Sequence, residues 1–232
     1  MKEHYKVWDV KIDDYFSLSD PHDKLIFLLQ LGILAPSSHN SQPWKFEVET
    51  NSISIFPEPK RLLAFSDSNN RQAYISLGCV LENLLEAADY FRLKYSYVLG
   101  DDSMSYAVKI EFSNLNDKVS LPSEANHLAT FITGRHTNRN KYNLKQLPEQ
   151  HLSFLKSLEN TDIRIDIIFD QEIKNSIADV VMGATGYAMA LKPFRYELSK
   201  YLISNVSNSP TGMPGFTIGI PTPPSLIMPF MA

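Results

Sequence analysis

The sequence contains a single cysteine, Cys79, among its 232 residues. One thiol cannot form an internal disulfide or a multi-cysteine metal site, and this scarcity fits a reducing compartment. The chain also lacks an apolar run of about 18 to 20 residues, the length needed to span a bilayer. Its first residues are charged, with no apolar core of a signal peptide behind them. We therefore expect a soluble, cytoplasmic protein that makes no contact with a membrane.

Positive charge and paired histidines are scarce as well. The formal net charge is -4 at pH 7, and the isoelectric point is about 5.9. Nucleic-acid-binding proteins usually carry a basic face, and nothing in this composition indicates one. The six histidines stand apart, with no pair at the three- or four-residue spacing of helical metal ligands. We therefore predict neither a nucleic-acid partner nor a metal site.

The first 122 residues show regular apolar patterns. A largely buried helix is predicted over residues 23–34, started by Asp20 and Pro21 and ended by Pro36. A long helix is predicted over residues 67–92, because apolar side chains recur there every three or four residues. Alternating apolar residues predict four strands: 45–50 and 52–56 as a hairpin, then 94–99 and 106–112.

A second unit is predicted to begin near Ser123. Its expected helices cover residues 124–134, 148–158, 172–190 and 193–203, and its expected strand covers residues 163–169. Six of the 14 prolines lie in residues 210–232, and we predict neither helix nor strand after Ser209. The mixture of helices with short antiparallel pieces indicates an α+β fold.

The first polar constellation runs from Pro36 to Trp44, as Pro-Ser-Ser-His-Asn-Ser-Gln-Pro-Trp. Three hydroxyls, two amides and an imidazole gather between a buried helix and a strand. A flat heterocycle with alternating carbonyl and N–H edges, such as an isoalloxazine, needs such partners. The alternative is an ordinary turn, since Ser, Asn and Pro are turn residues. For His39 we expect a ring whose hydrogen bonds are satisfied by the backbone.

The second constellation lies between Gly134 and Tyr142. Alternate positions carry Arg135, Thr137, Arg139 and Lys141, which share one side if the segment is extended. Two guanidiniums and a hydroxyl suit a phosphate, because Arg pairs phosphate oxygens bidentately. The alternative is a solvated loop whose basic residues pair with nearby acids.

The third constellation, Asp67 to Arg71, opens the long predicted helix. The N-terminus of a helix attracts anions, and Arg71 would strengthen that attraction. The simpler interpretation is that Asp67 or Ser68 caps the helix.

Residues 35–44 with Phe46 resemble the signature of the nitroreductase family, Ala-Pro-Ser-Ser-x-Asn-x-Gln-Pro-Trp-x-Phe. Ordinary members carry an Arg-x-Ser-x-Arg element before this signature, whereas here Arg135-x-Thr137-x-Arg139 follows it. That order, with Asp67 to Arg71 and the Tyr-Ile-Ser-Leu-Gly that begins at Tyr74, is similar to the Acg-like branch, in which one chain holds two nitroreductase-like halves.

The resemblance covers most of residues 20–225 and implies a nitroreductase-like α+β fold. We then expect an antiparallel-rich mixed sheet flanked by helices. The first half would comprise residues 1–122, and the second, incomplete half residues 123–232.

The same resemblance implies a non-covalently bound FMN. Arg135, Thr137 and Arg139 would hold its phosphate and ribityl chain. Ser37, Ser38 and Asn40 would approach the flavin from the other half. Gln42 and Arg71 are two further expected contacts.

The implied reaction passes electrons from NAD(P)H through the flavin to an electron-poor acceptor, such as a nitroaromatic or a quinone. In this family NAD(P)H stacks on the flavin, which agrees with the lack of a Gly-x-Gly-x-x-Gly fingerprint in the sequence. The flavin carries out the chemistry, so we nominate no catalytic side chain.

Two alternatives stay open at this point. The protein could sequester or store flavin without turnover, or it could be a degenerate fragment without a cofactor. Members of the Acg-like branch continue with a further strand and helix, so we expect a C-terminally truncated chain. If the chain is complete as given, a homodimer is a further expectation, because an incomplete half would expose apolar surface.

Overall fold

The computed structural model describes residues 3–101, 106–117, 129–139, 141–143 and 145–228. The chain forms two compact units. Unit 1 combines the residues up to Asn138 with those from Tyr196 onward, and unit 2 runs from Arg139 to Arg195. The sequence-based boundary between residues 122 and 123 lies outside the described residues, and the two predicted halves stay a prediction.

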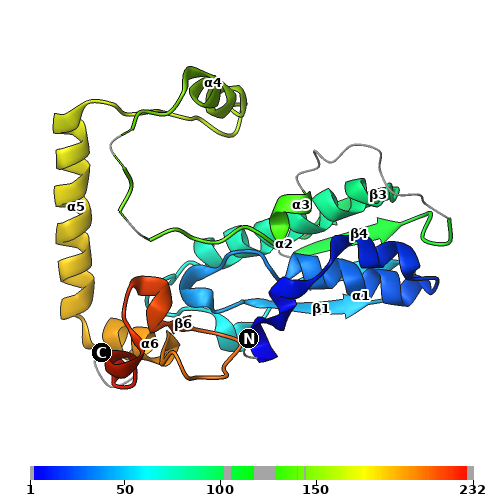
Figure 1. Cartoon of the computed structure of the whole chain (residues 1–232), viewed down its shortest axis with the longest axis horizontal. Helices are drawn as coiled ribbons and strands as arrows, with labels where there is room; N and C mark the ends of the chain where they lie inside the picture. Colours follow the sequence, from blue (N-terminus) through cyan, green and yellow to red (C-terminus); the bar gives the residue numbers. More distant parts are fainter. Residues whose placement is uncertain (1–2, 102–105, 118–128, 140, 144, 229–232) are drawn as a thin grey trace. The chain divides into compact units, whose positions relative to one another are not determined.

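A four-stranded antiparallel sheet forms the centre of unit 1 (Figure 1). Its order is β1-β2-β4-β3, and the strands are Trp44–Val48 (β1), Ser52–Pro57 (β2), Tyr95–Leu99 (β3) and Val108–Phe112 (β4). Trp44 pairs with Pro57 and Val48 with Ile53, so the predicted hairpin is confirmed. Strands β3 and β4 confirm the second predicted pair. Mixed helices and an antiparallel sheet agree with the α+β class.

Two long helices pack against each other and against this sheet: α1 (Pro21–Gly32) and α2 (Arg71–Tyr90). Asp20 caps α1, because its side chain accepts a hydrogen bond from the backbone N–H of His22, with Pro21 at the first helical position. Their apolar faces meet the sheet in a core that includes Leu28, Ile55 and Leu84, each with 0% exposed surface. The core therefore fixes the ends of α1, β1 and α2, which carry the candidate site.

The shorter elements of unit 1 lie around this core. The 3-10 helices are Glu3–Asp9 (η1), Ile12–Ser17 (η2), Ser38–Asn40 (η3), Pro59–Arg61 (η4) and Gly215–Ile218 (η5). The remaining elements are the helices Ala129–Ile132 (α3) and Thr222–Ser225 (α7), the strands Leu202–Ile203 (β5) and Met213–Pro214 (β6), and the C-terminal part of Lys192–Tyr201 (α6). Only α3 represents the helix predicted over residues 124–134, whose earlier part lies outside the described residues.

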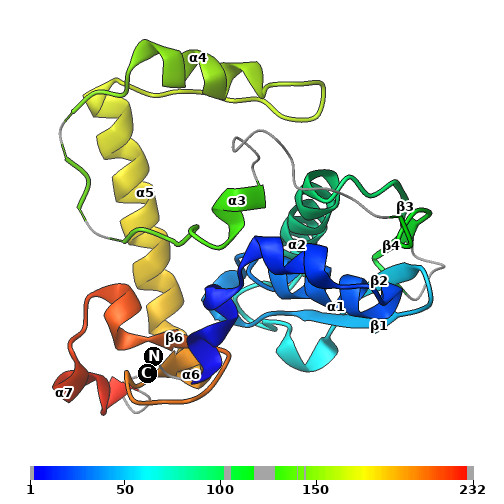
Figure 2. The ribbon, with the colours of Figure 1, turned by 45° about the vertical axis from the view of Figure 1, so that its right-hand side comes forward.

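Unit 2 contains Glu149–Ser157 (α4) and Gln171–Ala190 (α5), joined by an irregular segment (Figure 2). Both helices match their predicted positions. Asp170 caps α5 by accepting a hydrogen bond from the backbone N–H of Ile173. No residue of either helix is buried within the described part of the chain.

The strand predicted over residues 163–169 is wrong, because this segment has no ladder partner in the described residues. Side chains form hydrogen bonds with the backbone N–H and carbonyl of Ile165 instead. Ile165 donates its N–H to Glu159 Oε1 at 3.4 Å and accepts from Lys156 Nζ. An alternating apolar pattern needs a neighbouring strand before it becomes part of a sheet.

The proline-rich C-terminal segment departs from its predicted lack of structure. Met213 and Pro214 pair in parallel with Leu202 and Ile203, the latter two of which were predicted to be helical. Prolines occupy the first turn of α7, where their missing N–H groups leave no helical hydrogen bond unmade. No helix of the described residues is both long and apolar enough to cross a membrane.

Candidate functional site

The serine- and amide-rich loop lies between the C-terminal end of α1 and the start of β1. Three of its residues adopt left-handed backbone conformations without being glycine: His39 (φ 55°), Asn40 (φ 53°) and Gln42 (φ 51°). Such a conformation costs an L-residue roughly 1 to 2 kcal/mol, less for Asn. Strained backbone of this kind persists only where surrounding contacts hold it, and it is common at binding sites.

Contacts inside unit 1 hold this loop. Ser37 Oγ accepts a hydrogen bond from the N–H of Gln42 at 3.0 Å, which closes the turn. The backbone N–H of Asn40 donates to the carbonyl of Ser37 at 3.0 Å. Arg61 donates from Nη1 to the carbonyl of Gln42 at 3.2 Å. The loop is therefore a folded turn, which agrees with the alternative interpretation of its composition.

A distant segment fastens the same loop. Asn40 Nδ2 donates to the carbonyl of Gly212 at 3.0 Å, and the N–H of Gly212 donates to the carbonyl of Asn40 at 3.1 Å. Gln42 Nε2 donates to the carbonyl of Pro210 at 2.6 Å. We call residues 210–212 the clasp. Both amide side chains predicted to meet a flavin thus donate hydrogen bonds to the protein's own backbone.

Gly212 allows the clasp to pack closely against Tyr201 and Ile203. Its φ is 97°, in the left-handed region. A Cβ atom at this position would stand 2.9 Å from the carbonyl oxygen of Tyr201 and 3.0 Å from Cγ2 of Ile203. A larger residue would push the clasp away from Tyr201 and Ile203.

The N-terminus of α2 is capped by Asp67. Its carboxylate accepts hydrogen bonds from the N–H of Gln72 at 3.0 Å and of Ala73 at 2.8 Å, while Asn69 Oδ1 accepts from the N–H of Arg71 at 3.2 Å. These backbone donors are therefore occupied, and the capping interpretation of this constellation describes the geometry. The exposed side chain of Arg71 leaves a cation beside this end of the helix.

The loop and the start of α2 are joined by a glutamine. Ser38 Oγ donates to Oε1 of Gln72, and Gln72 Nε2 donates to the carbonyl of Ser66 at 3.3 Å. Ser38 therefore lies next to the residue that follows Arg71, so two of the three predicted constellations meet here.

Glu197 of α6 reaches the same region and is 7% exposed. Its carboxylate accepts hydrogen bonds from the N–H groups of Phe65 (3.0 Å) and Ser66 (2.8 Å) and from Ser66 Oγ (2.6 Å). Burial raises the pKa of Glu197, but the hydrogen bonds from Ser66 and Phe65, together with the charge of His39, lower it below the usual value of glutamate. The carboxylate is therefore ionised at neutral pH.

His39 faces α6. Its ring centroid lies 5.9 Å from that of Tyr201. Its Nε2 atom is buried and has no hydrogen-bond partner among the described residues, so the expectation of a backbone-satisfied ring is wrong for this nitrogen. Burial lowers the pKa of His39, and the charge of Glu197 acts in the opposite direction.

Arg135 approaches the base of the loop from a distant part of the sequence. Its Nη2 donates to the carbonyl of Leu34 at 3.2 Å, across a separation of 101 residues. Its charge also lowers the pKa of the Cys79 thiol, although burial raises that pKa by more. The guanidinium therefore lies near both the loop and α2.

Seven of the eight predicted contact residues belong to unit 1; they are Ser37, Ser38, Asn40, Gln42, Arg71, Arg135 and Thr137. The structure brings the four loop residues together with the start of α2, and it brings Arg135 to the base of the loop. Thr137 is exposed, and Arg139 begins unit 2. Sequence reasoning missed Gln72 and Glu197, because nothing near them in the sequence indicates a contact with the loop.

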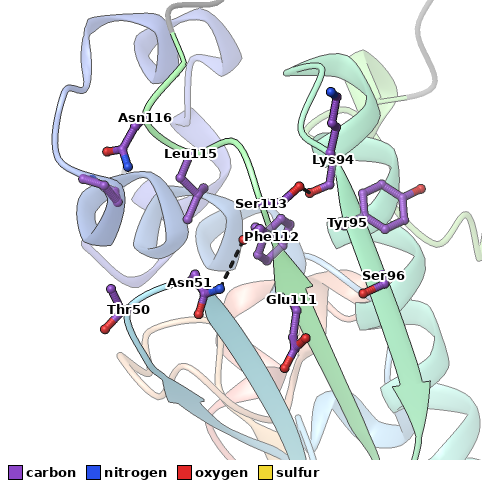
Figure 3. A pocket seen from close by; sticks show the side chains of 11 residues that line it. Thr50, Asn51, Lys94, Tyr95, Ser96, Glu111, Phe112, Ser113, Leu115 and Asn116 are labelled. Atoms are coloured by element: carbon purple, nitrogen blue, oxygen red, sulfur yellow. Dashed lines mark hydrogen bonds between the residues drawn. The ribbon is translucent and has the colours of Figure 1, made fainter.

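A separate hollow of about 640 Å³ lies at the other end of the sheet (Figure 3). Asn51, Lys94, Glu111 and Phe112 contribute to its wall, and Asn51 Nδ2 donates to the carbonyl of Phe112 at 3.4 Å. Strand β1 leads from the loop at Trp44 to this end, so its length separates the two places. None of the eight predicted contact residues lines this hollow.

Several curated proteins are similar to this chain. The acg protein of Mycobacterium tuberculosis (strain ATCC 25618 / H37Rv) is 30% identical over 155 residues, which make up 61% of this chain and 43% of that relative. PigM of Serratia sp. (strain ATCC 39006) is 26% identical over 156 residues, 65% of this chain and 43% of PigM. Both carry provisional NAD(P)H nitroreductase names.

The similarity is to proteins named nitroreductase. A further relative with such a name, Rv3131 of Mycobacterium tuberculosis (strain ATCC 25618 / H37Rv), is 35% identical over 60 residues, 26% of this chain and 17% of the relative. No family model matches the sequence. The chain matches less than half the length of acg and of PigM. These names support a nitroreductase-like family.

Proposed function

We propose that this protein binds FMN and acts as an oxidoreductase that passes electrons from NAD(P)H to an electron-poor acceptor, a nitroaromatic or a quinone. The observation that carries the proposal is the contact of Arg135 with the carbonyl of Leu34, directly before the serine- and amide-rich loop. It combines a fixed cation with a dense set of hydroxyls and amides. A phosphorylated heterocycle needs both.

The residues present fit FMN in two respects. Arg135 and Arg71 are exposed cations near the two ends of the loop region, and either can pair with phosphate oxygens. Ser37 and Ser38 bring hydroxyls to the same loop. In this proposal Arg135 and Thr137 of unit 1 hold the phosphate and ribityl chain.

In the same proposal the loop residues Ser37, Ser38, Asn40 and Gln42 approach the ring. The bound flavin would supply the hydride chemistry. The chain's own residues would bind and orient it. Because hydrogen bonds hold the left-handed turn, the loop would be present in one conformation before binding. This reduces the conformational entropy lost when the ligand binds. The proposal requires no protein acid, base or nucleophile.

A second candidate function, flavin storage without turnover, is favoured by the clasp. Asn40 and Gln42 both donate to backbone carbonyls of residues 210–212. Chain that lies over the loop in this way would limit the approach of a nicotinamide to a flavin bound there. A storage protein would keep the phosphate-binding cations, but NAD(P)H could not reach its bound flavin.

The test is an absorption spectrum of the 232-residue chain after it has been mixed with FMN and desalted. NADPH, and separately NADH, is then added under argon. A retained flavin spectrum that bleaches supports the oxidoreductase. A retained spectrum that does not bleach supports storage. Loss of all flavin on desalting contradicts FMN binding by this chain and removes both candidates for it.

A further inference from the structure

Glu197 is connected to the candidate loop by an unbroken path of hydrogen bonds. Its carboxylate holds Ser66, the carbonyl of Ser66 accepts from Gln72, and the carbonyl of the Gln72 side chain accepts from Ser38. Every link lies within unit 1. A change at Glu197 therefore reaches Ser38 through two intermediate residues.

A second path joins the same two elements through the next residue of the loop. His39 presents its ring to α6, with Tyr201 beside it and the charge of Glu197 acting on it. Its buried Nε2 has no partner in the part of the chain that the structure describes. Since this nitrogen makes no hydrogen bond there, the position of the ring depends on its packing, including its contact with Tyr201.

We propose that Glu197 is a positioning residue of the candidate site, which holds the loop of residues 37–42 in its left-handed conformation through Ser66, Gln72 and Ser38 on one side and through His39 on the other. The proposal extends the proposed function, because it adds the residue that arranges the predicted flavin contacts. Glu197 itself need not touch a ligand.

The physical reason lies in the loop's backbone. Three left-handed residues without glycine are unstable unless their surroundings fix them. The hydrogen bonds within the loop are local, and those of the clasp act on Asn40 and Gln42. Glu197 acts on two other residues of the loop, Ser38 and His39. Its removal should therefore loosen the loop while leaving the clasp's own residues intact.

The first experiment measures amide hydrogen exchange in Glu197→Gln. The N–H groups of Asn40, Ser41 and Gln42 are hydrogen-bonded within the loop. We expect these amides to exchange roughly tenfold faster in the variant, as for the loss of a charged hydrogen-bond acceptor. Exchange in β2 and β4 should stay unchanged. The matched control is Glu82→Gln, at an exposed position of α2.

Ser66→Ala serves as a milder second variant, because it removes one donor to Glu197 and no buried charge. It should produce a smaller acceleration of the same three amides. Equal loop exchange in wild type, Glu197→Gln and Ser66→Ala would overturn the proposal. Faster exchange throughout the sheet would also overturn it, since Glu197 would then act on general stability.

A second readout is the affinity for FMN. We expect Glu197→Gln to weaken FMN binding roughly tenfold, while Glu82→Gln leaves it unchanged. If the wild type binds no FMN but the loop amides respond to Glu197→Gln, the proposed function fails and the positioning role stands. If FMN binds equally to both proteins and loop exchange is unchanged, the positioning role fails and the proposed function stands.

The pH profile distinguishes positioning from a merely structural contact. Glu197 and Tyr201 of α6 are the titratable groups that face His39, and Arg61 acts on Tyr201. Burial lowers the pKa of His39 below its usual value of about 6.5. The neutral ring's contribution to loop stability is therefore complete above that value and is lost as the pH falls through the folded-state pKa.

Loop exchange corrected for the intrinsic rate should accordingly accelerate in the wild type as the pH falls from about 7 to about 5. His39→Asn tolerates the left-handed backbone and should flatten this dependence. The effect of Glu197→Gln should also shrink in the His39→Asn background. Additive effects together with an unchanged pH profile would remove His39 from the proposal.

Discussion

At the scale of single residues, Arg135 is the cation that the candidate site depends on for binding phosphate. It joins a predicted phosphate-binding segment to the carbonyl of Leu34, the residue before the loop. Among the described residues this contact uses one of its five N–H donors, and the exposed guanidinium has further donors that could meet an anion. The exposure of the residue agrees with such a role.

Arg135→Ala should weaken FMN binding about tenfold or more, because a guanidinium–phosphate interaction contributes roughly 1.5 to 3 kcal/mol. Flavin fluorescence titration measures the affinity. Arg164→Ala is the matched control, since Arg164 is exposed in unit 2 and pairs with Asp166 at 3.0 Å. An unchanged affinity in Arg135→Ala would remove this residue from the site.

Tyr15 offers a test within the core. Its ring stacks on Phe91 with centroids 3.7 Å apart, and its hydroxyl is buried without a hydrogen-bond partner in the described residues. Burial raises the pKa of this tyrosine. An unpaired buried hydroxyl costs about 1 to 3 kcal/mol.

Tyr15→Phe should therefore leave the free energy of unfolding unchanged or raise it by about 1 kcal/mol, because the stacking is kept. Tyr15→Leu should lower it, since the stacking is lost. Urea denaturation followed by tryptophan fluorescence measures both. A clear loss of stability in Tyr15→Phe would mean that the hydroxyl has a partner.

Residue contacts were the least predictable feature of the site. The motif indicated the loop residues and the turn. It could not indicate the left-handed conformations of His39 and Gln42, because neither residue type requires them. Glu197 escaped prediction because its partner Ser66 is 131 residues away in sequence. No local pattern encodes such a contact.

At the scale of single elements, the cap at the N-terminus of α2 affects the site, because the first turn of this helix carries Arg71 and Gln72. Asp67 accepts from two of its backbone N–H groups, and Gln72 and Arg71 start from this turn. Loss of this cap would fray the turn that carries both residues.

Asp67→Ala should lower the free energy of unfolding by about 1 to 2 kcal/mol, the usual effect of losing a helix cap. Ser68→Ala, at the exposed neighbouring position, should have little effect. Thermal denaturation followed by circular dichroism measures both variants. If Ser68→Ala proved the more damaging of the two, Asp67 would not be the cap.

Elements with local signals were predicted best. Asp20 with Pro21 defined the start of α1, and alternation defined the β1–β2 hairpin, because caps and hairpins depend on neighbouring residues. The segment 163–169 shows the limit. Its alternation was genuine, but a strand depends on a partner that the pattern does not describe.

At the scale of the whole molecule, the two units differ in how far their side chains are buried from solvent. Unit 1 contains the core, whereas α4 and α5 contain no buried residue among those described. Apolar side chains of α5 such as Val180 (72% exposed) and Tyr187 (70%) face solvent. A helix without buried contacts opens locally at little cost in free energy.

Peptides from residues 171–190 should therefore exchange their amide hydrogens within seconds, whereas those from β2 and β4 stay protected far longer. Hydrogen exchange followed by mass spectrometry measures both in one sample. Protection of α5 equal to that of α2 would contradict this expectation and would show that another surface covers α5 in solution.

The clasp also determines the order in which the site can be completed during synthesis. Asn40 and Gly212 are 172 residues apart in sequence. During synthesis the loop therefore leaves the ribosome well before the clasp does. The sheet and α2 can form earlier from residues already made. A nascent chain stalled before residue 210 should therefore display a folded sheet beside a loose loop. A complete loop would then form only after residues 210–212 have left the ribosome.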